Sequence, residues 1–80
     1  MAFQVGDKVK WTSQANGHAK TKEGVVIAVV PAGDYMVDHI PSGYNRLFFG
    51  LPRKHKSYLV RVGRGMTPYW PRVKHLQPSD

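Results

Sequence analysis

The chain has 80 residues, no cysteine, and 12 Lys and Arg against five Asp and Glu, which gives a formal net charge of +7. This length supports a single domain over residues 1–80 with one hydrophobic core, and the absence of cysteine excludes a disulfide framework and a thiolate metal site. The N-terminal residues lack the pattern of a signal peptide, and no apolar run is long enough to cross a bilayer. We therefore expect a soluble, cytoplasmic protein with no membrane contact.

The positive charge is concentrated in the second half of the chain. Residues 1–40 contain four Lys and four acidic residues, whereas residues 41–80 contain eight Lys and Arg with Asp80 as their only acidic residue. This asymmetry is typical of proteins that bind a polyanion, most often nucleic acid. The alternative interpretation is a surplus of charge that serves solubility.

Residues 3–12 alternate between apolar and polar side chains, which is the period of a half-buried strand. The apolar face is formed by Phe3, Val5, Val9 and Trp11. Gly6-Asp7 makes a turn between two extended pieces, and the two lysines that follow fall on the solvent-facing side. The next segment, 13–22, is polar, has no period and contains the turn dipeptide Asn16-Gly17. We predict that this segment is a long hairpin loop.

The longest apolar run of the chain is Glu23-Gly-Val-Val-Ile-Ala-Val-Val30. Because it is mostly β-branched and has no polar face, it predicts a strand that is buried on both faces. Gly24 and the turn residues 31–34 limit this strand to about eight residues. A short, bent antiparallel sheet wrapped around it as a small barrel is the simplest way to cover both faces.

The pattern Phe3-x-Val5-Gly6-Asp7-x-Val9-x-Trp11, followed by a glycine-containing loop and Gly24-x-Val26-x-x-Val29, resembles the opening hairpin of small SH3-like barrels of the Tudor and KOW kind. The resemblance covers about the first 30 residues. In those families the Gly-Asp pair turns the chain into the first strand, and Gly-x-Val opens the second. The resemblance implies an all-β fold, a small antiparallel five-stranded SH3-like barrel, and it bears on the fold rather than on a function.

Three further strands complete the expected barrel: 35–40, 57–62 and 67–76. Residues 57–62 alternate clearly, with Tyr58 and Val60 on one face. The last segment holds two prolines, which confine it to an edge, and its Val73 and Leu76 are expected to seal the barrel. Residues 77–80 are predicted to be a frayed tail.

The connection 41–56 is longer than is usual in a compact domain, and loops of this length are usually functional or disordered. It mixes aromatic and basic side chains, as expected where base stacking and phosphate contact coincide. These side chains are Tyr44, Phe48 and Phe49 with Arg46, Arg53, Lys54 and Lys56. The alternative is that large apolar side chains of this loop fold back to plug an open barrel end, and we favour it for at least one of the two phenylalanines. The candidates for the plug are Leu47, Phe48, Phe49 and Leu51.

No arrangement in the sequence is typical of a catalytic or metal site. No pair of carboxylates has a spacing that suggests shared acid–base work, and Asp38 and His39, adjacent on a predicted strand, should point to opposite faces. The four histidines are His18, His39, His55 and His75, and none of them forms the close pairs of a zinc site. We expect neutral histidines, no metal, no cofactor and no enzymatic activity.

Nucleic-acid binding is the function that the sequence supports best. If the first strand neighbours the last, as barrel closure requires, the basic side chains form one continuous strip that follows the phosphates of DNA or RNA without reading sequence. The candidate binding residues are Lys8, Lys10, Lys20, Lys22, Arg46, Arg53, Lys54, Lys56, Arg61, Arg64, Arg72 and Lys74. Exposed Tyr44, Tyr69 or Trp70 would add base stacking worth about 1–3 kcal/mol each. The alternative is a charge coat dispersed around the barrel.

A protein-interaction module is the second interpretation. Small barrels often present aromatic residues at one end, as an aromatic groove or as a cage for a cationic side chain. The available residues are Trp11, Tyr35, Tyr58, Tyr69 and Trp70. A cationic ligand would meet an already cationic surface, so an acidic protein fits better as the partner. Such a module would suit a phage or mobile-element accessory protein that binds a host factor. In either case we expect a monomer.

Overall fold

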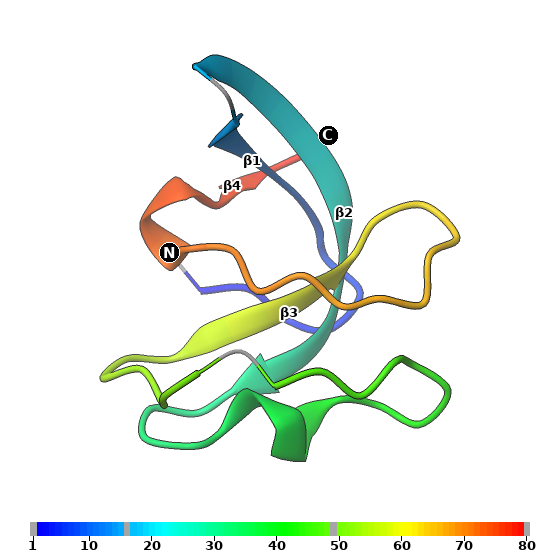
Figure 1. The fold of residues 1–80 in the computed structure, drawn as a ribbon, viewed down its shortest axis with the longest axis vertical. Helices are drawn as coiled ribbons and strands as arrows, with labels where there is room; N and C mark the ends of the chain where they lie inside the picture. Colours follow the sequence, from blue (N-terminus) through cyan, green and yellow to red (C-terminus); the bar gives the residue numbers. More distant parts are fainter. Residues whose placement is uncertain (1, 16, 49, 80) are drawn as a thin grey trace.

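The structure is built on a four-stranded antiparallel sheet with the strand order β3-β2-β1-β4 (Figure 1). The computed structural model describes residues 2–15, 17–48 and 50–79. The strands are β1 (Lys8–Ala15), β2 (His18–Val30), β3 (Ser57–Arg61) and β4 (Gln77–Pro78), and two single-turn 3₁₀ helices are η1 (Met36–His39) and η2 (Val73–His75). The described part of the chain contains no α-helix, and neither of its 3₁₀ turns has the length to span a membrane.

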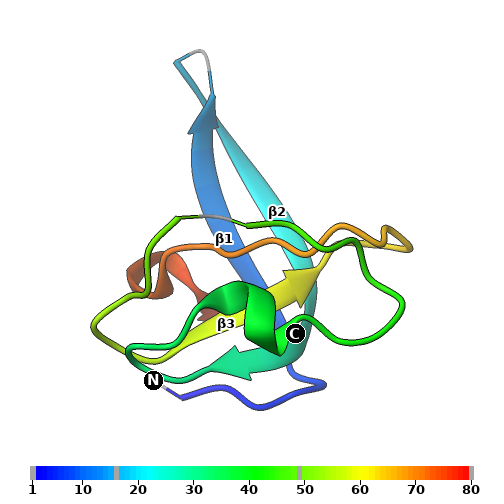
Figure 2. The ribbon, with the colours of Figure 1, turned by 60° about the horizontal axis from the view of Figure 1, so that its bottom comes forward.

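Strands β1 and β2 form one long, curved hairpin whose tip projects from the body of the molecule (Figures 1 and 2). The register pairs Ala15 with His18, so residues 16–17 alone connect the strands, and Gly17 has the positive φ of 79° that suits a tight turn. The predicted long loop at 13–22 is therefore wrong. This part of the hairpin projects into solvent, so its strands need no apolar face. A polar segment can therefore form backbone pairing here. Asn16 lies outside the described residues.

A bulge in β2 allows both faces of the sheet to be covered. Beside β3 the register shifts between Val26 and Ala28, so Ile27 is the extra residue. As a result Val26 packs into one hydrophobic cluster, and Ala28, two residues later, packs into another on the opposite face. No residue from Gly24 to Val30 is exposed, which confirms the prediction of a strand with both faces covered. The predicted length of about eight residues is wrong, because β2 has 13 residues and continues through the polar segment that pairs with β1.

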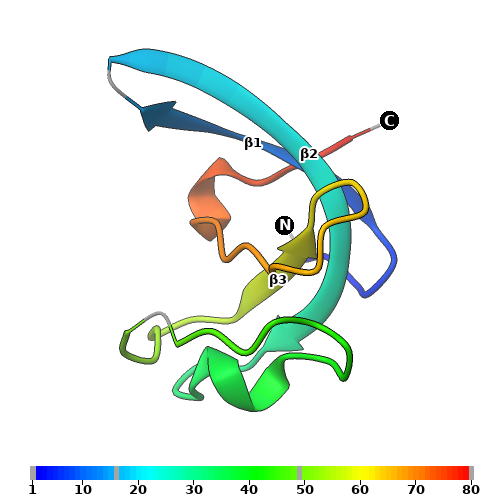
Figure 3. The ribbon, with the colours of Figure 1, turned by 45° about the vertical axis from the view of Figure 1, so that its right-hand side comes forward.

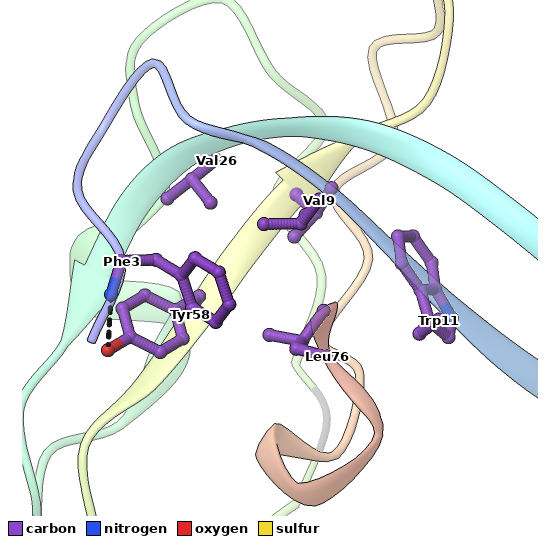
Figure 4. Packing of buried hydrophobic residues seen from close by; sticks show 7 residues of the cluster. Phe3, Val9, Trp11, Val26, Tyr58 and Leu76 are labelled. Atoms are coloured by element: carbon purple, nitrogen blue, oxygen red, sulfur yellow. Dashed lines mark hydrogen bonds between the residues drawn. The ribbon is translucent and has the colours of Figure 1, made fainter. Parts of the chain in front are cut away.

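The first hydrophobic cluster lies between the hairpin, β3 and η2 (Figure 4). It consists of Phe3, Val9, Trp11, Val26, Tyr58, Val60 and Leu76, with Val73 packed against it, so Val73 and Leu76 contribute to the core as expected. The backbone N–H of Phe3 donates to the Tyr58 hydroxyl at 3.1 Å, and the two rings meet edge to face at 5.4 Å. Val5 is 64% exposed, because it lies in the turn before β1, and so it does not join the predicted apolar face.

The second hydrophobic cluster packs η1 against the opposite face of β2 and β3. It consists of Ala28, Val30, Met36, Ile40 and Leu59. The predicted strand at 35–40 is wrong. A strand would turn Met36, Asp38 and Ile40 to one side, whereas a helical turn buries Met36 and Ile40 and leaves Asp38 exposed.

The connection from 41 to 56 is long and irregular, as predicted, and of the four candidates for a plug Leu47 is half-buried, whereas Phe48 and Leu51 are exposed. Phe48 is 63% exposed and Leu51 is 77% exposed. Phe48 stacks instead on the exposed Tyr35, with ring centres 5.7 Å apart. Phe49 lies outside the described residues.

The chain after β3 does not form the expected strand over 67–76. Tyr69 makes one isolated bridge to Val60, and Pro68 and Pro71 on either side lack the N–H groups that would extend the pairing. The stretch then passes beneath the curved hairpin, turns through η2 and reaches β4 (Figure 3).

Strand β4 makes β1 an interior strand of the sheet. It pairs with Val9 and Lys10, and the N–H of Ser79 donates to the Lys8 carbonyl at 2.9 Å. The predicted frayed tail is therefore wrong over its described residues, 77–79. The sheet has four strands rather than five, and no pairing between β3 and β4 closes it within the described ranges.

Candidate functional site

Two adjoining hollows lie where residues 53–55 meet residues 70–75. The first, of about 450 Å³, is lined by Arg53, His55, Arg72, Val73 and Lys74. The second, of about 630 Å³, is lined by Trp11, Thr12, Ser13, Arg53, Trp70, Pro71, Arg72 and His75. Because Arg53 and Arg72 line both, the hollows form one groove with a cationic half and an aromatic half. We call it the basic groove.

Arg53 holds the aromatic half of the basic groove in place. Its Nη1 donates to the Pro71 carbonyl and its Nη2 donates to the Trp70 carbonyl, both at 2.9 Å. Its guanidinium carbon lies 3.8 Å from the centre of a Trp70 ring, within the range of a cation–π contact. The indole Nε1 of Trp70 donates to the buried Ser57 Oγ at 2.8 Å. The Trp70 ring is thus fixed at one edge and on one face.

The surroundings of Arg53 in the groove disfavour its charge. Burial lowers the pKa of Arg53, and the positive charge of Arg72 lowers it further. Arginine nevertheless keeps its proton at neutral pH. Both groups are therefore cationic, and an anion in the groove would relieve their repulsion.

No described carboxylate forms an ion pair with a Lys or Arg side chain, although Glu23 lies opposite Lys10 in the register of β1 and β2. Within residues 2–15, 17–48 and 50–79, the only ion pair joins His39 to Asp34, at 2.9 Å. All twelve Lys and Arg lie in these ranges, so none of them has a described acidic partner. The positive field is consequently available to a polyanion outside the molecule.

The inner face of the hairpin adds two cations beside the groove. Trp11 pairs with Lys22 and Ser13 pairs with Lys20, and partners across antiparallel strands share a face. Lys22 Nζ lies 4.7 Å from the centre of the Tyr69 ring, and the Trp11 ring is 6.1 Å from that ring. Lys20 and Lys22 thus lie on β2, next to the groove, and not in a loop as predicted.

Five of the twelve predicted cations therefore gather at the groove and its hairpin wall: Lys20, Lys22, Arg53, Arg72 and Lys74. Lys54 and Lys56 are exposed on the chain that leads from Arg53 to β3. β1 does neighbour the last strand, as the predicted continuous strip requires. Even so, alternation along β1 places Lys8 and Lys10 on the face opposite Trp11, so the strip is divided between two faces.

Three further predicted cations, besides Lys8 and Lys10, lie away from the groove. Arg46 and Arg64 are exposed in two loops that meet where the Asn45 N–H donates to the Met66 carbonyl at 2.8 Å. Both loops extend to the side of the molecule opposite η2 (Figure 1). Arg61 is the last residue of β3, where it pairs with Val25 of β2.

The predicted stacking residues divide in the same way. Tyr69 is 37% exposed beside Lys22, and Trp70 lines the groove, whereas Tyr44 is half-buried and packs against the second cluster. Sequence reasoning left out of the site His55, His75, Thr12 and Ser13, which also line the groove. The two histidines had a local signal, because each lies one or two residues from a lining Arg or Lys.

The cations and hydroxyl groups of the groove can bind anions, and its indole rings can stack on flat rings. In the described part of the chain, no three His, Cys, Asp or Glu residues are grouped closely enough to hold a metal ion. Comparisons with protein-family models, curated proteins and solved structures found no match to this chain. The functional argument therefore depends on the groove alone.

Proposed function

We propose that the chain is a non-catalytic module that binds nucleic acid through the basic groove. The observation that carries this proposal is the grouping of Arg53, Arg72 and Lys74, none with a described acidic partner, directly beside indole rings. Cations that contact phosphates and rings that stack on bases form the usual combination at nucleic-acid sites. The module acts as a cytoplasmic monomer that needs no cofactor, and its contacts do not read sequence.

We also propose that the domain is an SH3-like barrel of the Tudor or KOW kind. The sheet order, with β1 between β2 and β4, supports this assignment. The bridge between Val60 and Tyr69 adds a short fourth pairing on the other side of β3, and η2 leads from there to β4. Residues 70–76 lead along the chain from this bridge to β4, and their Val73 and Leu76 pack in the first hydrophobic cluster, which also supports the assignment.

The second candidate function is docking to an acidic protein. Exposed apolar side chains in the connections after β2 favour a protein partner. They are Tyr35, which stacks on Phe48, and Leu51. A stoichiometric partner retained from lysate after nuclease treatment would support it. If only nucleic acid is retained, and no protein remains after nuclease, this candidate fails.

The first test is binding at several salt concentrations. Affinity for mixed-sequence DNA or RNA should fall steeply between about 50 and 200 mM salt, because bound phosphates release counterions. Fluorescence anisotropy of labelled oligonucleotides measures this fall. If no association is detected at the lowest salt, the proposed function is overturned.

A matched pair of variants locates the binding surface. Arg72→Glu with Lys74→Glu reverses two charges at the groove, and Arg46→Glu with Arg64→Glu reverses two exposed charges at the opposite end. Each replacement changes the charge by −2, so both variants go from +7 to +3. We expect the groove variant to lose at least about tenfold in affinity and about 1.4–1.8 in salt slope, the contribution of two phosphate contacts. Equal losses in the two variants would indicate a diffuse charge coat.

A further inference from the structure

We propose that the basic groove takes single-stranded nucleic acid in preference to duplex, with an unpaired base stacked on the Arg53 guanidinium. This inference rests on the proposed function and names its substrate class. It comes from the way in which Arg53, Trp70 and Arg72 share the two halves of the groove.

The guanidinium of Arg53 is a preformed flat platform. One of its faces lies on the Trp70 ring at 3.8 Å, and two hydrogen bonds to the carbonyls of Trp70 and Pro71 fix its plane. The same side chain is partly exposed and lines both hollows. Bases of single-stranded nucleic acid stack on planar guanidinium groups as well as on aromatic rings. A base placed here would continue the stack that Trp70 and Arg53 begin.

The neighbouring half of the groove suits the phosphate attached to that base. Its lining side chains are Arg53, His55, Arg72 and Lys74, together with Val73, and none is acidic. Because Arg53 and Arg72 border both hollows, one nucleotide can reach the platform and the cationic half together. The repulsion between these two arginines would be relieved by the same phosphate.

Duplex nucleic acid cannot use this platform. In a duplex the bases are paired and stacked on one another, so only their edges are exposed in the grooves. The hollow beside Trp70, of about 630 Å³, has the size of a small-molecule site rather than of a surface that accepts a double helix. A duplex would contact only the outer cations, whereas an unpaired strand would also gain the stack.

The test uses the emission of the two tryptophans, because Trp11 and Trp70 both line the aromatic half. The full chain is titrated with a thymidine oligonucleotide of about 20 nucleotides, longer than the usual single-strand site sizes. A duplex of mixed sequence and equal length, and an abasic strand with the same sugar-phosphate backbone, are titrated at the same salt. We expect the thymidine strand to bind at least about tenfold more tightly than the other two and to quench the tryptophan emission.

Each outcome decides between the inference and the proposed function. Equal affinities for the thymidine strand, the duplex and the abasic strand would overturn the inference and leave the proposed function standing. Tighter binding of the duplex would do the same. No binding of any of the three at low salt would overturn both. The abasic strand tests stacking without any change to the protein, so the result does not depend on a variant that folds.

One substitution then assigns the stack to Arg53. Arg53→Lys keeps the charge but removes the planar group, so the preference for the thymidine strand over the abasic strand should fall about tenfold while the salt slope stays unchanged. Arg72→Lys is the control, and it should keep the preference. If the preference survives Arg53→Lys in a variant whose circular dichroism matches that of the parent, the platform is not Arg53.

Discussion

Gly24 lies where the backbone of β2 leaves no room for a larger residue beside β3. A Cβ atom at this position would lie 2.3 Å from the Arg61 carbonyl oxygen and 2.6 Å from Val60 Cγ1. The first of these neighbours is backbone, which cannot rotate away as a side chain tip can. The sequence pattern indicated Gly24 as the start of a strand, and the structure shows that it approaches the backbone of β3 closely.

Gly24→Ala should therefore destabilise the fold strongly. We expect the free energy of unfolding to fall by about 3 kcal/mol, the upper end of the usual cost of overpacking. Gly33→Ala is the control, because Gly33 has a positive φ of 84° but nothing within 4 Å of an added Cβ. It should cost only about 1–2 kcal/mol, from backbone strain. Denaturant unfolding of both variants measures the difference, and a Gly24→Ala protein as stable as Gly33→Ala would contradict the close approach.

Arg53 and Trp70 show what could be predicted of the site at the scale of residues. The sequence identified both as candidates, from charge and from aromatic character. It could not reveal that Arg53 binds the carbonyls of Trp70 and Pro71, because those contacts join residues 17 and 18 positions apart. It also could not separate the cations of β1 from those of β2, since that division depends on the register of the hairpin.

At the scale of elements, the hairpin divides into a buried base and a projecting arm. Residues 25–30 of β2 pair with β3, whereas residues 18–24 pair only with β1. The arm holds side chains that are mostly exposed, and its backbone amides have one paired edge. Elements with few buried apolar contacts open more readily than the core.

Amide hydrogen exchange should reflect this division. We expect amides paired within 12–21 to exchange at least about tenfold faster than amides of 26–30, measured by NMR or by mass spectrometry. Addition of the thymidine oligonucleotide should slow exchange in the arm, whose inner face carries Lys20 and Lys22, more than in β3. Uniform protection along the hairpin of the free protein would show that the arm is not an independent, weakly held element.

The elements that the sequence predicted correctly are those whose pattern of apolar residues fits a strand and no other element. The run 23–30 is apolar and β-branched, residues 57–62 alternate, and the two lie in β2 and in or next to β3. The sequence failed where tertiary contacts chose among weak patterns. Residues 35–40 contain a helical turn, because a turn buries Met36 and Ile40 and leaves Asp38 in solvent. Residues 67–76 make only one bridge, because their prolines lack the N–H groups that strand pairing needs.

At the scale of the whole molecule, the unpaired charge carries a cost in stability. A net charge of +7 on 80 residues, without an Asp or Glu partner for any Lys or Arg in the described ranges, makes the folded chain repel itself. The groove concentrates this repulsion, because burial and then the charge of Arg72 lower the pKa of Arg53. The features that would attract a polyanion are thus the ones that strain the free protein.

This relation predicts that a variant which binds less should be more stable. In low salt, Arg72→Glu with Lys74→Glu should melt a few degrees above the parent, because it removes like charges beside Arg53. The distal pair Arg46→Glu with Arg64→Glu carries the same net charge and should give a smaller rise. Salt near 1 M shortens the screening length to about 3 Å, so the two variants and the parent should then converge. Thermal melts at both salt concentrations measure this, and equal rises for the two variants at low salt would mean that net charge, rather than the groove, is the source of the strain.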